Sequence, residues 1–199
     1  MVDALIVSNL LLWILLVVLA GIVLALVRQI GVLHERVAPA GALAVQGGPA
    51  PGQPAPELVV EGWDGATLPI GGTDPEGHST LLFFVSPTCP VCKELLPVIG
   101  PVAAAEAAGT RVVIASDGLR DEHEAFVRDH DLASRRYVLS TELGVAYRVG
   151  RLPWAVLIDA GGLVTAAGLV NTREHLESLF EAGRRGAATV QQFVSRQVA

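Results

Sequence analysis

The chain contains only two cysteines, Cys89 and Cys92, and two residues separate them. A pair at this spacing can form a disulfide within one turn, and the thiolate of such a cysteine is the attacking species in disulfide exchange. The apolar run Leu81–Val85 predicts a buried strand before the pair, and Pro90 suits the first position of a helix that starts after Cys89. Unpaired N–H groups at such a helix start favour the thiolate of Cys89. We therefore predict a redox-active pair in which Cys92 resolves a mixed disulfide made by Cys89.

Two other interpretations of the cysteine pair stay open at this point. The thiols could be buried structural groups, or they could supply half of a zinc site. Zinc needs two further ligands, and His78, His123 and His130 show no ligand spacing relative to the pair. We expect no metal and no cofactor other than the Cys89–Cys92 disulfide.

Length and charge limit the classes of function. With 199 residues, the chain is long enough for one ordinary domain and an appendage. Its net charge of −6 and its isoelectric point near 5.3 argue against nucleic acid as a partner. The mean hydropathy of +0.50 is high, and the N-terminus accounts for it.

The N-terminal region predicts a single membrane anchor. After a short N-terminal end (residues 1–3), Ala4–Val27 carries no charge, and as a helix it would be about 36 Å long, enough to span a bilayer. A cleaved signal peptide is the alternative, but Asp3 stands where a basic region is expected. Arg28 and Arg36 follow the span and would place the C-terminal domain in the cytoplasm, whereas disulfide chemistry favours the oxidising side. Sequence physics alone leaves this orientation open.

The remainder of the chain predicts a linker and one α/β domain. Residues 28–52 form a linker rich in Gly, Ala and Pro, and the domain covers residues 53–199. Hydrophobic patterns predict strands at 57–60, 67–70, 81–85, 111–116, 155–159 and 163–167, and helices at 90–108, 121–130, 141–147 and from 173 onward. We expect Pro97 to kink its helix. This order predicts a mixed sheet with helices on both faces; residues 187–198 suggest a weak amphipathic helix without an assigned role.

The segment Phe84–Lys93, the helix proline Pro97 and the Leu152-Pro153 pair before the closing hairpin resemble the thioredoxin superfamily. The resemblance implies a thioredoxin-like α/β fold, here with an N-terminal β-hairpin extension and a preceding transmembrane helix. It also implies that Pro153 is cis and lies against the cysteines, where it and Trp154 would bind the substrate chain.

Four features together resemble the MauD family, the membrane-anchored, thioredoxin-like accessory proteins of methylamine utilisation. They are the single anchor, Gly52–Pro56 (GQPAP), Ser86–Pro97 (SPTCPVCKELLP) and Gly168–Ala182 (GLVNTREHLESLFEA). The resemblance implies a thiol–disulfide oxidoreductase or isomerase with its domain on the periplasmic side of the inner membrane. Its partners would be the disulfide-rich small subunit of methylamine dehydrogenase, during maturation, and an unidentified redox protein. A periplasmic reductase for cytochrome c maturation and a non-catalytic assembly chaperone are the alternatives.

Two departures from the general thioredoxin pattern concern the residues around the cysteines. Thr88 stands where an aromatic residue usually precedes the first cysteine, and Phe83 stands where a buried acid usually assists proton transfer. Cys92 therefore lacks an obvious local base, and we consider water or Glu106 for that step. Pro90 and Val91 lie between the cysteines and set the reduction potential.

Overall fold

The computed structural model describes residues 6, 8–21, 23 and 48–185. The chain divides into two compact units, residues 1–44 and 45–199. In the first unit, residues 8–21 are helical, and their apolar side chains are exposed. Among the described residues, no helix combines the length and the apolar character needed to cross a membrane. The predicted span 4–27 includes residues outside the described ones, as does the linker 28–52, and the predicted helix 187–198 lies wholly outside them.

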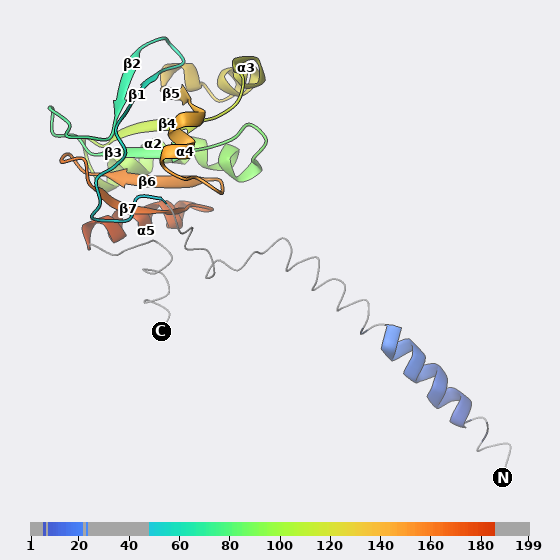
Figure 1. The fold of residues 1–199 in the computed structure, drawn as a ribbon. Coiled ribbons are helices and arrows are strands. Elements are labelled where there is room, and N and C mark those ends of the chain that lie inside the picture. The colour runs from blue at the N-terminus through green and yellow to red at the C-terminus, as the bar shows by residue number, and fades with distance from the viewer. Residues whose placement is uncertain (1–5, 7, 22, 24–47, 186–199) are drawn as a thin grey trace. The chain divides into compact units, whose positions relative to one another are not determined.

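The second unit is built around a five-stranded mixed sheet (Figure 1), whose strand order is β5-β4-β3-β6-β7. The strands are β3 (Thr80–Phe84), β4 (Arg111–Ser116), β5 (Arg136–Leu139), β6 (Trp154–Ile158) and β7 (Val164–Leu169). β3, β4 and β5 run parallel to one another, and β6 and β7 are antiparallel to their neighbours. The predicted mixed sheet is confirmed, with strand and helix ends shifted by about one or two residues.

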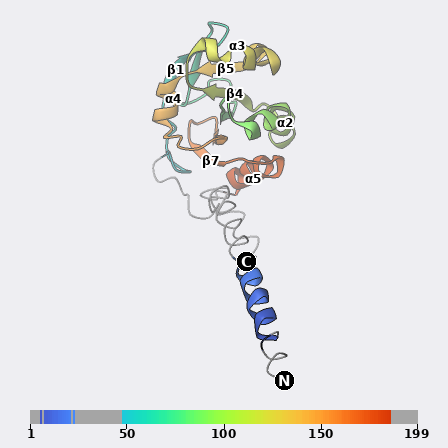
Figure 2. The ribbon, with the colours of Figure 1, turned by 90° about the vertical axis from the view of Figure 1, so that its right-hand side faces the viewer.

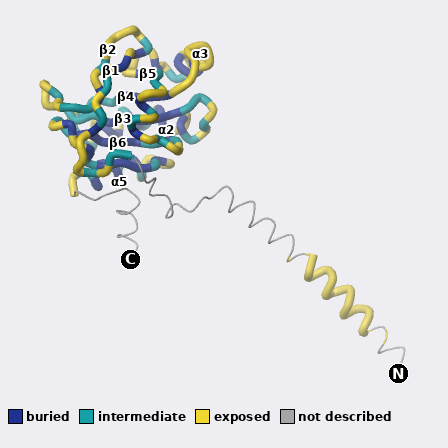
Figure 3. The backbone as a smooth tube through the Cα atoms, in the orientation of Figure 1, coloured by how far each residue is buried: buried dark blue, intermediate teal, exposed yellow. Residues whose placement is uncertain are grey.

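Helices cover both faces of this sheet. Figure 2 shows α2 (Pro90–Glu106) and α5 (Arg173–Arg184) on one side and α4 (Thr141–Ala146) on the other. Successive residues of β3 alternate between the two cores: Leu81 and Phe83 pack with α2 and α5, and Leu82 and Phe84 pack with α4. All four side chains are at most 4% exposed (Figure 3), which explains why β3 is a continuous apolar run.

Two smaller elements complete the face that carries α2. α3 (Arg120–Asp129) contributes the buried Phe126 and Val127 to the same core, and a short 3-10 helix, Leu132–Ser134, leads from α3 into β5. The predicted helix at 121–130 is therefore present, and its charged residues lie on the exposed side.

The strand β5 was missed by the sequence analysis. It has four residues, of which only Tyr137 and Val138 are buried, so its hydrophobic pattern is too short to distinguish it from a loop. β5 pairs with β4 on one side. On its other side it adjoins the N-terminal hairpin of β1 (Leu58–Glu61) and β2 (Thr67–Ile70). Beside that hairpin Gly62 bridges to Val138, and the backbone N–H of Trp63 donates to the Tyr137 carbonyl at 2.7 Å.

The helix α2 runs without a break across Pro97 and Pro101, and the kink expected at Pro97 stays a prediction. Both prolines are exposed. The carbonyls that lose their helical partners therefore face solvent and can bind water, so the helix does not end at either proline.

Candidate active site

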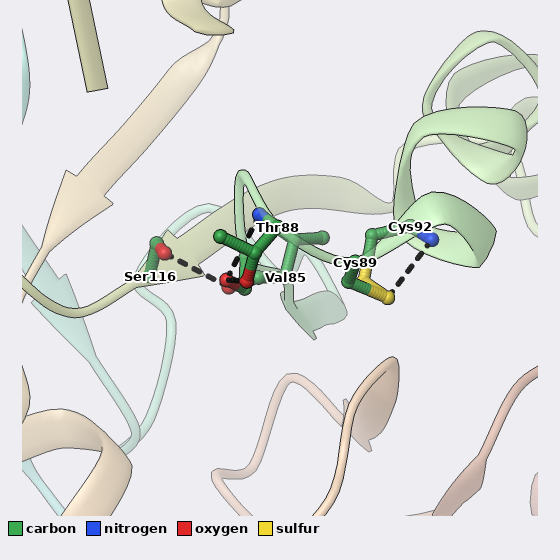
Figure 4. The surroundings of a disulfide bond; sticks show 6 residues. Val85, Thr88, Cys89, Cys92 and Ser116 are labelled. Atoms are coloured by element: carbon green, nitrogen blue, oxygen red, sulfur yellow. Dashed lines mark hydrogen bonds between the residues drawn. A yellow bond between two sulfur atoms is a disulfide. The ribbon is translucent and has the colours of Figure 1, made fainter. Parts of the chain in front are cut away.

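The cysteine pair lies at the start of α2, where β3 ends (Figure 4). Cys89 is the N-cap residue, Pro90 occupies the first helical turn, and the two cysteines form a disulfide with a Cα–Cα distance of 5.3 Å. The extended backbone of Cys89 (φ −90°, ψ 110°) is the conformation expected of an N-cap. The predicted placement of both cysteines is confirmed.

The two sulfurs differ in access and in electrostatic surroundings. Cys92 is fully buried, whereas Cys89 is partly exposed, so an external thiol reaches Cys89 first. The backbone N–H of Cys92 donates to Cys89 Sγ at 3.2 Å, and no acidic residue lies in the first turn of α2. This donor and the positive end of the helix stabilise negative charge on Cys89 Sγ when the disulfide opens.

The turn between β3 and the cysteines is held by short-range hydrogen bonds. The Cys89 N–H donates to the Ser86 carbonyl at 3.1 Å, and the Thr88 N–H donates to Ser86 Oγ at 3.3 Å. The hydroxyl of Ser116 on β4 donates to the Val85 carbonyl at 2.8 Å and ties the start of the turn to the sheet. Thr88 itself is exposed beside the disulfide.

The residue expected to face the cysteines, Pro153, follows a cis peptide bond, as the resemblance implied. Pro153 is buried, and its carbonyl accepts the Val170 N–H at 3.1 Å. The next residue, Trp154, begins β6 opposite Phe84 and packs into the core on the α4 face, whereas the cysteines belong to the core on the α2 face. The structure thus places Trp154 on the sheet face opposite the cysteine pair, and its substrate-binding role stays a prediction.

Of the two proton acceptors considered for Cys92, water and Glu106, the structure places Glu106 away from the cysteine. Phe83 is completely buried and cannot carry a proton. Glu106 is at the last turn of α2, about 21 Å along the helix from Cys92, and its carboxylate pairs with Arg184 at 3.0 Å. The suggestion that Glu106 assists Cys92 was therefore wrong, because the two residues lie at opposite ends of α2.

The histidines weighed for zinc have other partners. His78 belongs to a cluster with Asp74 and Glu76, and Arg111 pairs with both acids of this cluster. His123 is buried, and its Nδ1 lies 2.6 Å from the Tyr137 hydroxyl. In the described part of the chain, the set of side chains grouped closely enough for metal binding includes neither cysteine.

A hydrogen-bonded pair of buried side chains, His123 and Tyr137, joins α3 to β5. His123 Nε2 donates to the Asp117 carbonyl at 2.9 Å, which leaves Nδ1 to accept the Tyr137 hydroxyl when the ring is neutral. Burial raises the pKa of Tyr137 to about 12. Tyr137 is therefore a neutral hydrogen-bond donor under ordinary conditions, and it fixes α3 against β5.

A cavity of about 490 Å³ opens beside the turn and was missed by the sequence analysis. Phe84 and Val85 line it from the end of β3, and Leu152 lines it from the residue before Pro153. The cavity thus lies next to the turn that carries the cysteines and next to the loop that carries Pro153. Its other contributors come from separate segments that only the fold brings together, so no local pattern could have revealed it.

Comparison with known proteins finds close relatives along almost the whole chain. It is 46% identical to the methylamine utilization protein MauD of Paracoccus denitrificans, over 98% of this chain and 96% of that protein. It is 48% identical to MauD of Methylorubrum extorquens, over 96% of this chain and 92% of that protein. No family model matches the chain.

Solved structures support the fold. The thioredoxin domain of a thiol-disulfide oxidoreductase from Bacteroides vulgatus superposes with a TM-score of 0.54 at 17% identity, over 66% of this chain and 96% of that domain. The domain therefore has a thioredoxin-like fold, extended at its N-terminus by the β1–β2 hairpin.

Proposed function

The chain belongs to the MauD family of methylamine utilization proteins, and on that premise we propose that it is a membrane-anchored thiol–disulfide oxidoreductase. Its substrate is the small subunit of methylamine dehydrogenase, in which it forms or reshuffles disulfides during maturation. The observation that carries the proposal is the partly exposed Cys89, joined to the buried Cys92 at the N-terminus of α2. The buried Pro153, in the loop that resembles the substrate-binding loop of the superfamily, supports it.

In the oxidising direction, a substrate thiolate attacks Cys89 Sγ, because Cys92 Sγ is buried. A bond forms between the substrate sulfur and Cys89, the Cys89–Cys92 bond breaks, and Cys92 leaves as a thiolate. A second substrate thiolate then attacks the substrate sulfur of the mixed disulfide and releases Cys89 as a thiolate. The N–H of Cys92 at 3.2 Å stabilises that thiolate. The substrate has lost two electrons and two protons, and a disulfide of the redox partner takes up the electrons from the two cysteines.

Reshuffling uses the same groups without a net electron change. The thiolate of Cys89 attacks a substrate disulfide, and a different substrate thiolate later displaces it from the mixed disulfide. This mode needs the cysteines in the reduced state, so the reduction potential decides between the two modes.

The proposed location is the inner membrane, with the N-terminal segment 4–27 as the anchor and the thioredoxin-like domain in the periplasm. The support is the uncharged 4–27 run and the oxidising environment that disulfide formation requires. A reporter fused after residue 199 tests the orientation: activity of a reporter that works only in the periplasm is expected, and activity only of a cytoplasmic reporter would contradict it.

Two measurements test the function. The first is the reduction potential of the full-length protein in glutathione buffers: about −120 to −200 mV favours formation or reshuffling, whereas about −270 mV or lower indicates a reductase. The second is maturation of methylamine dehydrogenase in cells that carry Cys89→Ser, Cys92→Ser or both. We expect loss of the small subunit's disulfides in all three, and normal maturation in the double variant would indicate a non-catalytic assembly role.

A further inference from the structure

The cavity beside the active-site turn has an apolar interior and a cationic rim. Phe84, Val85 and Leu152 supply apolar lining, and Val145, an exposed hydrophobic residue at 69% exposure, also contributes to it. Its volume of about 490 Å³ lies within the range of about 300–1,000 Å³ that ligand sites occupy. The cavity is thus large enough to receive several side chains of a bound polypeptide.

Two arginines, Arg148 and Arg151, also line this cavity. Both are exposed, and among the described residues neither side chain forms an ion pair or a hydrogen bond. By contrast, Arg111 and Arg184 each pair with two carboxylates. The one carboxylate that lines the cavity belongs to Asp117, so the lining carries a positive excess on a chain whose net charge is −6.

The backbone at Arg148 is a second, independent observation. Arg148 follows α4 in the left-handed conformation, with φ of 49°, and its N–H donates to the Val145 carbonyl at 3.0 Å. Glycine is the usual residue in this position after a helix, because a side chain is disfavoured there. Arg148 thus adopts an unfavourable backbone conformation at the edge of a cavity, and its side chain has no ion-pair partner within the described part of the chain. Backbone strain of this kind is found at binding sites.

We propose that this cavity binds an acidic segment of the substrate polypeptide, close in sequence to the cysteine that reacts with Cys89. Carboxylates of that segment pair with Arg148 and Arg151, and an adjacent apolar side chain packs against Phe84 and Val145. The inference rests on the proposed function, since it specifies the substrate class of the same site. Val85 and Leu152 place the cavity next to the turn that carries the cysteines and next to the loop that carries Pro153, and in this proposal the bound segment continues along that turn to Cys89.

Exchange with short peptides tests this with the full-length protein in detergent. Three dithiol peptides share the same cysteine pair and one apolar residue and differ only in the flanking residues. The acidic peptide is flanked by Asp and Glu, the neutral peptide by Asn and Gln, and the basic peptide by Lys. In each reaction the peptide thiols are oxidised to a disulfide, and the Cys89–Cys92 disulfide is reduced to two thiols. Each rate constant is divided by that of the same peptide with glutathione disulfide, which corrects for the effect of the flanks on thiol reactivity.

We expect the corrected rate for the acidic peptide to exceed that for the neutral peptide about tenfold at low salt. The ratio should approach one near 1 M salt, where the screening length is only about 3 Å. Arg148→Gly and Arg151→Gln should each lower the acidic-to-neutral ratio several-fold. Arg136→Gln is the matched control, because Arg136 is exposed on β5, also forms no ion pair among the described residues, and does not line the cavity; it should leave the ratio unchanged.

Two outcomes would overturn the inference while leaving the proposed function intact. One is equal corrected rates for all three peptides, and the other is an acidic preference that persists in both Arg148→Gly and Arg151→Gln. Absence of exchange with every peptide and with glutathione would instead refute the redox function, and the inference with it. Thermal unfolding of each variant confirms that a changed ratio does not arise from loss of the fold.

Discussion

Replacing Arg148 with glycine should stabilise the protein while it removes a charge. Arg148 has φ of 49°, a conformation that is unfavourable by about 1–2 kcal/mol for an L-residue. Glycine adopts it freely but loses more chain entropy on folding, about 0.5–1 kcal/mol. Since the Arg148 side chain has no ion-pair partner among the described residues, the net expectation is a gain of about 0.5–1 kcal/mol.

The assay is thermal unfolding of the full-length protein, followed by the loss of helical circular dichroism. For a domain of this size, the gain corresponds to a rise in Tm of about 1–4 °C. Arg148→Ala is the matched control: it removes the same charge but keeps a Cβ in the left-handed conformation, so its stability should stay within about 0.5 kcal/mol of the parent protein. A Tm for Arg148→Gly at or below that of Arg148→Ala would refute the reasoning from backbone strain.

The remaining predictions concern the disulfide, a buried tyrosine and a turn. In Cys92→Ser, the Cys89 thiolate should attack a substrate disulfide, release one substrate thiolate and accumulate as the mixed disulfide, because the resolving thiol is gone. Mass spectrometry of non-reduced protein detects this species; Cys89→Ser should accumulate none, and equal trapping by both would contradict the assigned roles. Because burial raises the pKa of Tyr137 to about 12, the folded state keeps a proton that the unfolded state loses near pH 10. The contribution of Tyr137 to stability should therefore be unchanged below about pH 10 and fall by up to about 2–3 kcal/mol as pH approaches 12; burial also raises the pKa of Tyr147, which adds to the total fall. Tyr137→Phe should flatten this fall in urea titrations, and an unchanged slope would count against it. Gly162→Ala should lower stability by about 2 kcal/mol or more in the same titrations. The reason is that φ at Gly162 is 81° and that the new Cβ would lie 2.5 Å from the carbonyl carbon of Gly72. An unchanged midpoint would show that this turn can relax.

Much of the fold was predictable from local patterns. β3 and β4 are short apolar runs that only a sheet covered on both faces accommodates, and their predicted ranges agree with the structure apart from end shifts. The last helix was predicted from its cap, and Thr172 Oγ1 does accept the His175 N–H at 3.3 Å. These elements were found because each is specified by neighbours in sequence.

Elements that depend on distant partners were not predictable. β5 is a four-residue strand whose identity comes from pairing with β4 and from its contact beside the N-terminal hairpin. The mistaken suggestion for Glu106 has the same origin, because its ion pair with Arg184 joins residues 78 positions apart. Trp154 was grouped with Pro153 by sequence, whereas alternation along β6 turns its side chain to the other face of the sheet.

The sequence by itself determined the chemistry of the reacting pair: two cysteines at one spacing, a proline that starts the helix, and the apolar strand that precedes them. These are local relationships, and a helix start acts on a sulfur within one turn of it. Only the tertiary structure decided which sulfur is accessible and which cations lie beside it. Burial of Cys92 results from packing of the whole α2 face. Arg148 and Arg151 line the cavity because the loop after α4 passes next to the ends of β3 and β4. These strand ends are about sixty and about thirty residues away from the loop in the chain.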